Sequence, residues 1–249
     1  MPNRSYSSLL GLNFCKQIYP LFAPGFFNSS QPNHYHLTAV STFNYAIENA
    51  EFKDILNSGV VICDSKPIFL TLKILRTSVE MIRGADFMRA VLESDLGARR
   101  HFLIGSNPEQ LLKLSRFFST NYPRVQVSGT FAPPITDHET IIEMVLKIRE
   151  LQISDIVWVG LGSPKQDFIA SEISRKLNIS AVGIGAAFDY LSGNKKEAPM
   201  MFRLSGMEWF YRLMLEPRRL WRRYLIGNSK FLWLALRALL QSLRRRSNF

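Results

Sequence analysis

The chain is poor in cysteine and histidine, with two Cys and four His among its 249 residues. Cys15 and Cys63 lie far apart in the sequence, so a disulfide framework is not expected and a reducing compartment fits better. His34 and His36 are near each other but have no Cys or acidic residue at ligand spacing, and the other two His are isolated. The sequence therefore predicts neither a metal site nor a bound cofactor.

Long hydrophobic runs are also missing. No stretch reaches about 18 uninterrupted apolar residues, the length of a membrane-spanning helix. The N-terminal segment carries Arg4 as a lone charge, and Lys16, prolines and glycines interrupt the run from Leu9 to Phe27, which is not the pattern of a signal peptide. We therefore expect a protein that is made and kept in the cytoplasm.

Positive charge, in contrast, is abundant and unevenly distributed. The net charge is +11, and the segment from Leu204 onward holds ten Lys and Arg against two Glu. Trp209, Trp221 and Trp233 are interleaved with these basic residues. A solvated basic face is the usual form of a charge run, but a tail rich in Trp favours an anionic membrane surface over nucleic acid. We expect peripheral attachment at the inner face of the cell membrane.

Short β-type runs alternate with longer helical patterns, and 47% of the residues are hydrophobic, enough for a core. The predicted strands are His36–Val40, Val60–Cys63, His101–Ile104, Val125–Val127, Ile156–Val159 and Ala181–Ile184. The predicted helices are Phe43–Asn57, Asp86–Ser94, Glu109–Asn121, His138–Leu151 and Gln166–Leu177. This alternation predicts an α/β fold, a Rossmann-like, mostly parallel sheet flanked by helices, whose ligands bind at the carboxyl ends of the strands.

The pattern changes after Pro199, which predicts an α/β catalytic domain over residues 1–203 and a helical, basic C-terminal appendage over residues 204–249. The expected helices of the appendage are Ser205–Leu215, Arg218–Leu225 and Lys230–Leu243, the last with its N-cap in Gly227–Ser229.

Two glycine-containing turns follow predicted strands. In the first, Gly160 and Gly162 precede a helix that begins near Pro164, so ligand phosphate can approach both the backbone and a helix N-terminus; an ordinary tight turn is the alternative. The second, around Gly185, resembles a dinucleotide fingerprint in which Phe188 replaces the third glycine. It favours a phosphate or sugar turn, and supports an NAD-dependent oxidoreductase only weakly.

Polar side chains follow two further strands. Asp64 ends a buried strand, where partial desolvation would raise its pKa toward that of a general base; a helix N-cap or turn-initiating Asp before Pro67 is the alternative. Thr42 and Asn44 follow the first predicted strand and are able to bind sugar hydroxyls, although Thr42 is equally suited to an N-cap.

The appendage carries arginines at helical spacing. In a continuous helix, Arg212, Arg219 and Arg222 or Arg223 fall at i, i+7 and i+10 or i+11, on one face. Such a column suits a diphosphate, because each guanidinium can bind oxygens in a bidentate way. Pro217 interrupts the helix, so this alignment is approximate.

These motifs occur together in one order and spacing. They comprise Thr42-x-Asn44, Asp64 with Pro67, Gly84-x-Asp86, Gly105 with Pro108-Glu109, Tyr122-Pro123, Gly160-x-Gly162-x-Pro164-Lys165-Gln166, Gly185 with Phe188-Asp189, Ala198-Pro199, and Glu208-Trp209-x-Tyr211-Arg212 with Glu216-Pro217-x-Arg219. From about Thr38 to about Tyr224 the chain resembles the WecG/TagA/CpsF family, glycosyltransferase family 26.

The resemblance implies an inverting, metal-independent enzyme of cell-surface or exopolysaccharide biosynthesis. The sugar, N-acetylmannosamine, its uronic acid or a hexose such as glucose, would pass from a UDP-sugar to a polyprenyl-diphosphate-linked acceptor. The resemblance gives Asp64 as the general base, Arg212, Arg219 and Arg222 as contacts of the lipid diphosphate, and a set of substrate-binding residues. That set is Thr42, Asn44, Arg83, Gly162, Gln166, Gly185 and Asp189. The oligomeric state is open, with a homo-oligomer possible.

The chain departs from the family pattern at Ser65 and Met81, more mildly at Asp167, where the family usually has Glu, and over the first 35 residues, which match poorly. Ser65 stands where the family usually has a glycine after the base, and serine tolerates positive φ less readily. Met81 stands where the family usually has an arginine, so either Arg83 substitutes for it or a diphosphate contact is lost. A catalytically weak or inactive membrane-associated scaffold of a polysaccharide-assembly complex is therefore the alternative function.

Overall fold

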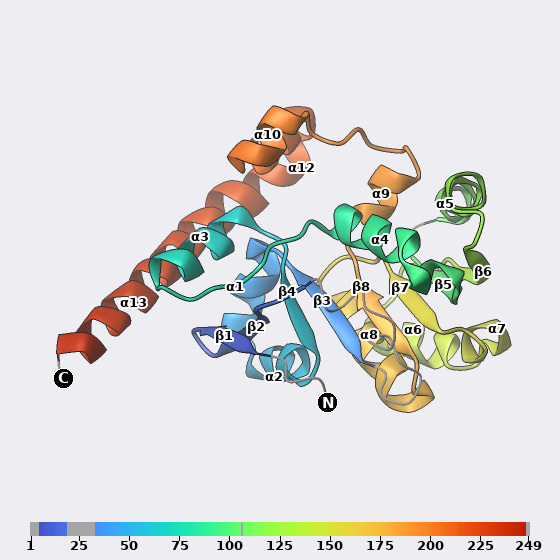
Figure 1. Ribbon diagram of the computed structural model, residues 1–249, viewed down its shortest axis with the longest axis horizontal. Helices are drawn as coiled ribbons and strands as arrows, with labels where there is room; N and C mark the ends of the chain where they lie inside the picture. Colours follow the sequence, from blue (N-terminus) through green and yellow to red (C-terminus); the bar gives the residue numbers. More distant parts are fainter. Residues whose placement is uncertain (1–4, 19–32, 106, 248–249) are drawn as a thin grey trace.

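In the computed structural model, which describes residues 5–18, 33–105 and 107–247, an eight-stranded sheet forms the centre of the protein (Figure 1). The strand order is β1-β2-β4-β3-β8-β7-β5-β6, and every neighbouring pair except the β1–β2 hairpin is parallel. The strands are β1 Tyr6–Leu9, β2 Leu12–Cys15, β3 His34–Thr38, β4 Val60–Cys63, β5 Arg100–Ile104, β6 Gln126–Phe131, β7 Ile156–Val159 and β8 Ser180–Gly183. The predicted α/β, Rossmann-like fold is confirmed.

Helices cover both faces of the sheet. Within β4, Val60 and Ile62 belong to one hydrophobic cluster, whereas Val61 and Cys63 belong to another, because successive side chains point to opposite faces. Helices α4, α5 and α9 pack on the first face, and α2, α6 and α8 pack on the second (Figure 1). The helices before the tail are α1 Val40–Glu48, α2 Ala50–Ser58, α3 Lys66–Ile74, α4 Gly84–Glu93, η2 Asp95–Ala98, α5 Pro108–Asn121, α6 His138–Val145, α7 Arg149–Gln152, α8 Lys165–Leu177 and α9 Ala187–Leu191.

Several predicted boundaries were wrong. The predicted helix Phe43–Asn57 is two helices, because Asn49 is extended and its side chain caps α2 by accepting a hydrogen bond from the Phe52 N–H at 2.9 Å. The predicted helix His138–Leu151 is likewise divided into α6 and α7. The first predicted strand, His36–Val40, lies two residues too late, and the predicted strand Val125–Val127 overlaps only the first two residues of β6. The β1–β2 hairpin and α3 were not predicted.

The chain after Pro199 forms what we call the tail helices (residues 200–247). They are α10 Met200–Ser205, α11 Glu208–Leu215, α12 Pro217–Trp221, the π-helical η3 Arg222–Ile226, and α13 Gly227–Ser247. Gly206, at φ +79°, and the non-helical Glu216, at φ −131° and ψ 58°, separate the first three. The predicted stop and new N-cap in Gly227–Ser229 is wrong, because η3 continues directly into α13.

Helix α13 packs against α1, on the side of the sheet where β1 and β2 lie (Figure 1). Its buried face, Phe231, Leu234, Ala235 and Ala238, joins the cluster that also contains Phe43 of α1. Along the described chain, no helix has both the length and the apolarity needed to span a bilayer. Helix α13 thus shares a core cluster with the β1–β2 edge of the sheet. The predicted domain boundary at residue 203 stays a prediction.

Candidate active site

A cavity opens at the carboxyl ends of β3, β4 and β8, where ligands bind in open parallel sheets. Ala39–Ser41 follow β3, Asp64–Pro67 follow β4, and Ile184 follows β8. The N-terminus of α4 forms another wall, and Gly84 there allows close approach, because a Cβ at this position would lie 3.0 Å from the Ile184 carbonyl oxygen. These segments form the floor of the cavity.

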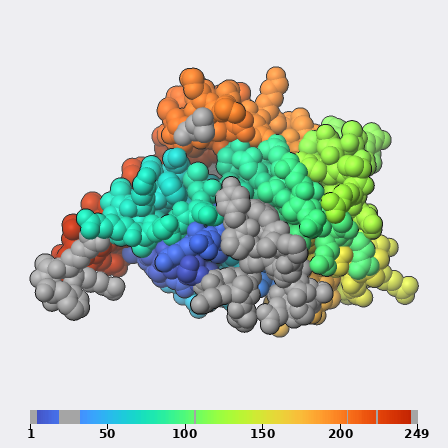
Figure 2. All heavy atoms as spheres, in the orientation of Figure 1, coloured from blue at the N-terminus to red at the C-terminus, as the bar shows by residue number. Residues whose placement is uncertain are grey.

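The tail helices form its roof. Arg203, Gly206, Glu208, Trp209 and Arg212 line the cavity from α10, α11 and their connection. Tyr224 and Asn228 line it from further along the tail. The roof rests on α3, where the side chain of Lys66 lies against the backbone of Gly206, and Figure 2 shows the orange atoms of the tail above the teal atoms of this region.

Asp64 lies on the floor directly after β4, as the sequence predicted. Its backbone N–H donates to the Thr38 carbonyl at 3.2 Å, which extends the β3–β4 pairing by one residue. Its carboxylate Oδ1 accepts a hydrogen bond from the Gly84 N–H at 3.1 Å, at the start of α4. Two backbone segments therefore hold the carboxylate in one position within the cavity.

The surroundings of Asp64 suit a proton acceptor. Burial raises the pKa of Asp64 to about 7, and the negative charge of Glu208 acts in the same direction. The Gly84 N–H and the positive charges of Arg83 and Arg212 lower the pKa, but by less. A carboxylate that titrates near neutral pH is matched to general base catalysis.

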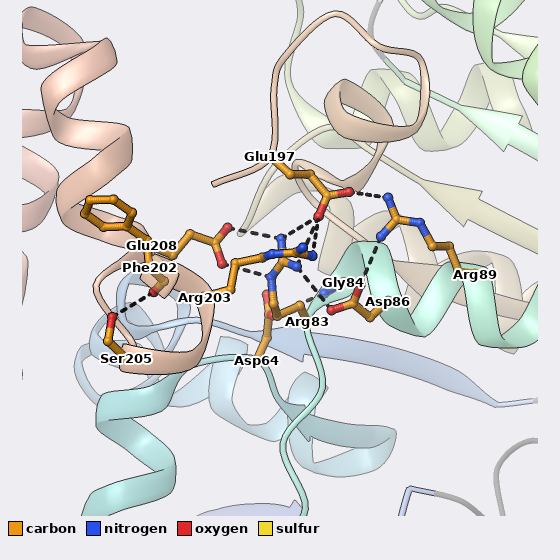
Figure 3. A network of polar contacts seen from close by, with 10 residues as sticks. All are labelled: Asp64, Arg83, Gly84, Asp86, Arg89, Glu197, Phe202, Arg203, Ser205 and Glu208. Carbon is orange, nitrogen blue, oxygen red and sulfur yellow. Dashed lines mark hydrogen bonds and ion pairs between the residues drawn. The ribbon is translucent and has the colours of Figure 1, made fainter. Parts of the chain in front are cut away.

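Arg83 is held beside Asp64 by a network of polar contacts (Figure 3). Its Nε pairs with Glu208 of α11 at 2.8 Å, and its Nη1 pairs with Glu197 at 3.1 Å and Asp86 at 3.2 Å. Glu197 also binds Arg89 of α4 and Arg203 of α10. Because Glu197 lies between α9 and α10, the network joins the α/β part of the chain to the tail helices.

Arg212 reaches the cavity from the roof. Its guanidinium carbon lies 5.9 Å from the ring centroid of Tyr190, which also lines the cavity. Burial raises the pKa of Tyr190, so its hydroxyl stays protonated at neutral pH. Arg212 therefore brings a positive charge into the cavity with an aromatic ring beside it.

Of the predicted site residues, the structure brings Asp64, Arg83 and Arg212 into this one cavity. Thr42 and Asn44 do not line it. They lie inside α1 rather than at a strand end, because β3 already ends at Thr38. The N-cap of α1 is Ala39, so the N-cap alternative for Thr42 is also wrong. Asn44 is buried and its Nδ2 donates to the Gly227 carbonyl at 2.7 Å. Their role as sugar contacts stays a prediction.

The two predicted glycine turns meet at Gln166. Its Oε1 accepts hydrogen bonds from the Gly162 N–H at 3.0 Å and the Gly185 N–H at 2.9 Å. Both glycines have positive φ, +79° and +59° respectively, which is the conformation glycine permits. Asp189 accepts a hydrogen bond from Gln110 at 2.8 Å and pairs with Lys195. None of these four candidates lines the described cavity, and their ligand contacts stay predictions.

The predicted column of arginines is wrong in this structure. Glu216 breaks the helix before Pro217, so Arg212, Arg219 and Arg222 do not share one helical face. Arg219 is exposed and pairs with Glu216, and the Arg222 guanidinium lies over the Trp221 ring at 5.2 Å. Neither lines the cavity.

The departures from the family pattern at Ser65 and Met81 have different consequences. Ser65 is the extended N-cap of α3, with φ −138°, so the turn after Asp64 requires no positive φ and serine fits it without strain. This removes one reason for expecting an inactive protein. Met81 lines the cavity, paired with Cys63 in an isolated β-bridge, and Arg83 stands close by on the same wall.

The sequence argument missed the acidic partner of the N-terminal histidines. His36 Nδ1 lies 2.8 Å from Asp167 Oδ1, and His36 Nε2 lies 2.7 Å from His34 Nδ1, all buried. Burial lowers the pKa of His34 to about 3, so this ring is neutral at physiological pH. The partner lies 131 residues away, so no local spacing predicted it. Within the described ranges, no three His, Cys, Asp or Glu side chains are arranged to hold a metal ion.

The family assignment implied by these features is confirmed by comparison. The model of the glycosyl transferase WecG/TagA/CpsF family matches residues 25–245. The chain therefore belongs to this family of glycosyltransferases.

Two groups of relatives carry the same enzyme name, N-acetylglucosaminyldiphosphoundecaprenol N-acetyl-beta-D-mannosaminyltransferase. The protein of Bacillus spizizenii is 27% identical over 184 residues, which cover 72% of this chain and 70% of that protein. The Bacillus subtilis protein has the same identity and coverage. The Staphylococcus aureus protein is 24% identical over 202 residues, which cover 79% of this chain and 78% of that protein.

Proposed function

We propose that this glycosyltransferase moves N-acetylmannosamine from a UDP-sugar to a sugar on a polyprenyl diphosphate, in the synthesis of a cell-surface polymer. The observation that carries this proposal is the cavity that places Asp64 beside Arg83 and Arg212. A proton acceptor and two cations in one cavity suit transfer away from a diphosphate leaving group. The names of the relatives support the choice of sugar and acceptor.

The proposed reaction is a single displacement. Asp64 takes the proton of an acceptor hydroxyl, whose oxygen forms a bond to the anomeric carbon of the donor. The bond between that carbon and the diphosphate oxygen breaks, and the electron pair leaves with the nucleotide diphosphate. Arg83 and Arg212 stabilise the negative charge that develops there. Attack opposite the leaving group inverts the anomeric centre.

The exposed face of α13 supports attachment to a membrane surface. Leu232, Trp233, Leu236 and Leu240 are each about half exposed or more, on the side of α13 opposite its buried residues. An amphipathic helix with Trp, Leu and basic residues suits the interface of an anionic bilayer. Because the tail helices also form the cavity roof, a lipid-borne acceptor would meet the cavity where the protein meets the membrane. We place the protein at the cytoplasmic face.

The test is acceptor-dependent release of nucleotide diphosphate. The full chain is mixed with UDP-N-acetylmannosamine, other UDP-sugars and a short-chain polyprenyl-diphosphate-linked N-acetylglucosamine, with and without a metal chelator. We expect release from one donor, only with acceptor, and unchanged by the chelator. A folded protein that binds vesicles but releases nothing from any donor contradicts the proposal and favours the inactive scaffold.

A further inference from the structure

Arg203, on α10, has an unusual position in the cavity wall. Its Nη1 donates to Glu197 Oε2 at 3.2 Å, and its side chain is 29% exposed. Its Nε atom is buried and has no hydrogen-bond partner. A buried guanidinium N–H without an acceptor is costly, because it has lost its hydration and gained nothing in return. An acceptor supplied by a ligand would remove that cost.

Two guanidinium groups converge at this point. Arg83 Nη1 and Nη2 both lie 3.1 Å from Glu197 Oε2, the same oxygen that binds Arg203. Figure 3 shows the two guanidinium groups side by side below Glu197. Arg83 has two further carboxylate partners, Asp86 and Glu208, whereas Glu197 is the single ion-pair partner of Arg203 within the described network. Within the part of the chain that the structure describes, Arg203 therefore has more N–H donors without a carboxylate partner than Arg83 has, and these donors can bind an anion.

The charge of the cavity also favours an anionic ligand. Four cationic side chains line it, from Lys66, Arg83, Arg203 and Arg212. The acidic residues in the lining are Asp64 and Glu208, and Asp64 carries only part of its charge near neutral pH because its pKa is about 7. The side chains that line the cavity therefore carry a net positive charge, to which Arg203 contributes.

We propose that Arg203 is a further substrate-binding residue, whose buried Nε–H donates to an oxygen of a substrate diphosphate beside Arg83. Glu197 acts as a positioning residue that holds both guanidinium groups toward the cavity. A planar guanidinium with one edge on Glu197 keeps its Nε edge for a phosphate oxygen, in the bidentate manner typical of arginine. This inference rests on the proposed function, because it names a binding group for the same reaction.

Isothermal titration calorimetry of the full chain tests the proposal with two probes, UDP and a short-chain polyprenyl diphosphate carrying N-acetylglucosamine. We expect R203Q to raise the Kd of one probe by about tenfold or more, the effect of losing a charge-assisted hydrogen bond. The affected probe identifies whether the diphosphate belongs to the donor or to the lipid. R203K, which keeps the charge without the Nε–H, should recover only part of the affinity. R218Q, an exposed arginine of α12 outside the cavity, is the matched control and should bind as the unaltered chain does.

Unchanged Kd values for both probes in folded R203Q would overturn the proposal. If R203Q does not fold, R203K decides, because full affinity without the Nε–H overturns the proposal equally. A chain that binds neither probe before any substitution also contradicts it. The proposed function is judged separately, by turnover of the unaltered chain. If the unaltered chain turns over and R203Q binds both probes with normal Kd values, only the role of Arg203 is overturned. If R203Q binds a probe more weakly but the unaltered chain does not turn over, only the proposed function is overturned.

Discussion

The floor and the roof of the cavity are built in different ways. The floor consists of strand ends and the start of α4, and backbone hydrogen bonds from Asp64 to Thr38 and from Gly84 to Asp64 define its geometry. The roof consists of the tail helices, which reach the floor through side chains, above all the ion pairs of Glu197 and Glu208. The comparison indicates that backbone contacts hold the proton acceptor in place, whereas two of the four cationic side chains of the cavity, Arg203 and Arg212, depend on the position of the tail helices.

Replacement of the floor carboxylate tests this division most strongly. D64N keeps the shape of the side chain but removes the proton acceptor, so we expect kcat to fall by about 100-fold to 10,000-fold, the range for loss of a general base. Steady-state release of nucleotide diphosphate measures the effect, with circular dichroism to show that the variant folds. Full turnover in folded D64N would show that the base lies elsewhere.

Arginines of the roof should differ according to whether they reach the cavity. R212Q removes a cavity cation, and we expect kcat/KM to fall by about 10-fold to 100-fold, the effect of a lost charge-assisted contact. R219Q removes an exposed arginine paired with Glu216, and with a short-chain acceptor in solution it should change kcat/KM by less than about threefold. Equal losses in both variants would restore the arginine column predicted from the sequence.

The link between roof and floor predicts a change in pH dependence. If Asp64 is the base, kcat/KM rises with pH up to about 7, where the carboxyl loses its proton. The negative charge of Glu208 helps to raise that pKa, so E208Q should lower it and move the acidic limb of the profile to lower pH.

D86N is the matched control for E208Q, because Asp86 also pairs with Arg83 but does not line the cavity. We expect the acidic limb of D86N to stay in place, whatever its absolute rate. An unmoved limb in E208Q would mean that the roof does not set the pKa of the base.

The smallest expected effect concerns Asn44, which ties α1 to the tail through the Gly227 carbonyl. N44A removes a partly buried hydrogen bond and should lower the free energy of unfolding by about 1–2 kcal/mol. Thermal or denaturant unfolding measures it. Asn121, whose amide bonds to the Phe117 carbonyl at the surface, provides the control, since N121A should change stability by less than about 0.5 kcal/mol. Lost turnover with unchanged stability in N44A would support the predicted sugar contact instead.

Local patterns were sufficient for the central sheet and for the floor. The apolar runs from Val60 and from Ile156 predicted β4 and β7 with their observed bounds, since buried parallel strands are nearly continuous in hydrophobicity. Asp64 was found for the same reason, because it directly follows such a strand. Two segments were missed. One is the β1–β2 hairpin, where the residues of β1 alternate between exposed and buried, and the other is α3, which begins at Lys66 and Pro67.

The roof was predicted only as a basic, helical segment. Helical spacing assumes one continuous axis, and the non-helical backbone at Glu216 ends that axis between Arg212 and Arg219. The contact of Glu197 with Arg83 joins residues 114 positions apart, and that of Glu208 joins residues 125 apart. No periodicity in the sequence carries such information.

The sequence by itself determined the parallel α/β sheet, the family and the place of Asp64 at a strand end, because these follow from local hydrophobicity and from motifs that neighbouring residues complete. Only the tertiary structure decided which arginines face the cavity and what holds them. That choice depends on where the tail helices turn and on which carboxylates they meet, and both are set by packing between segments far apart in the chain.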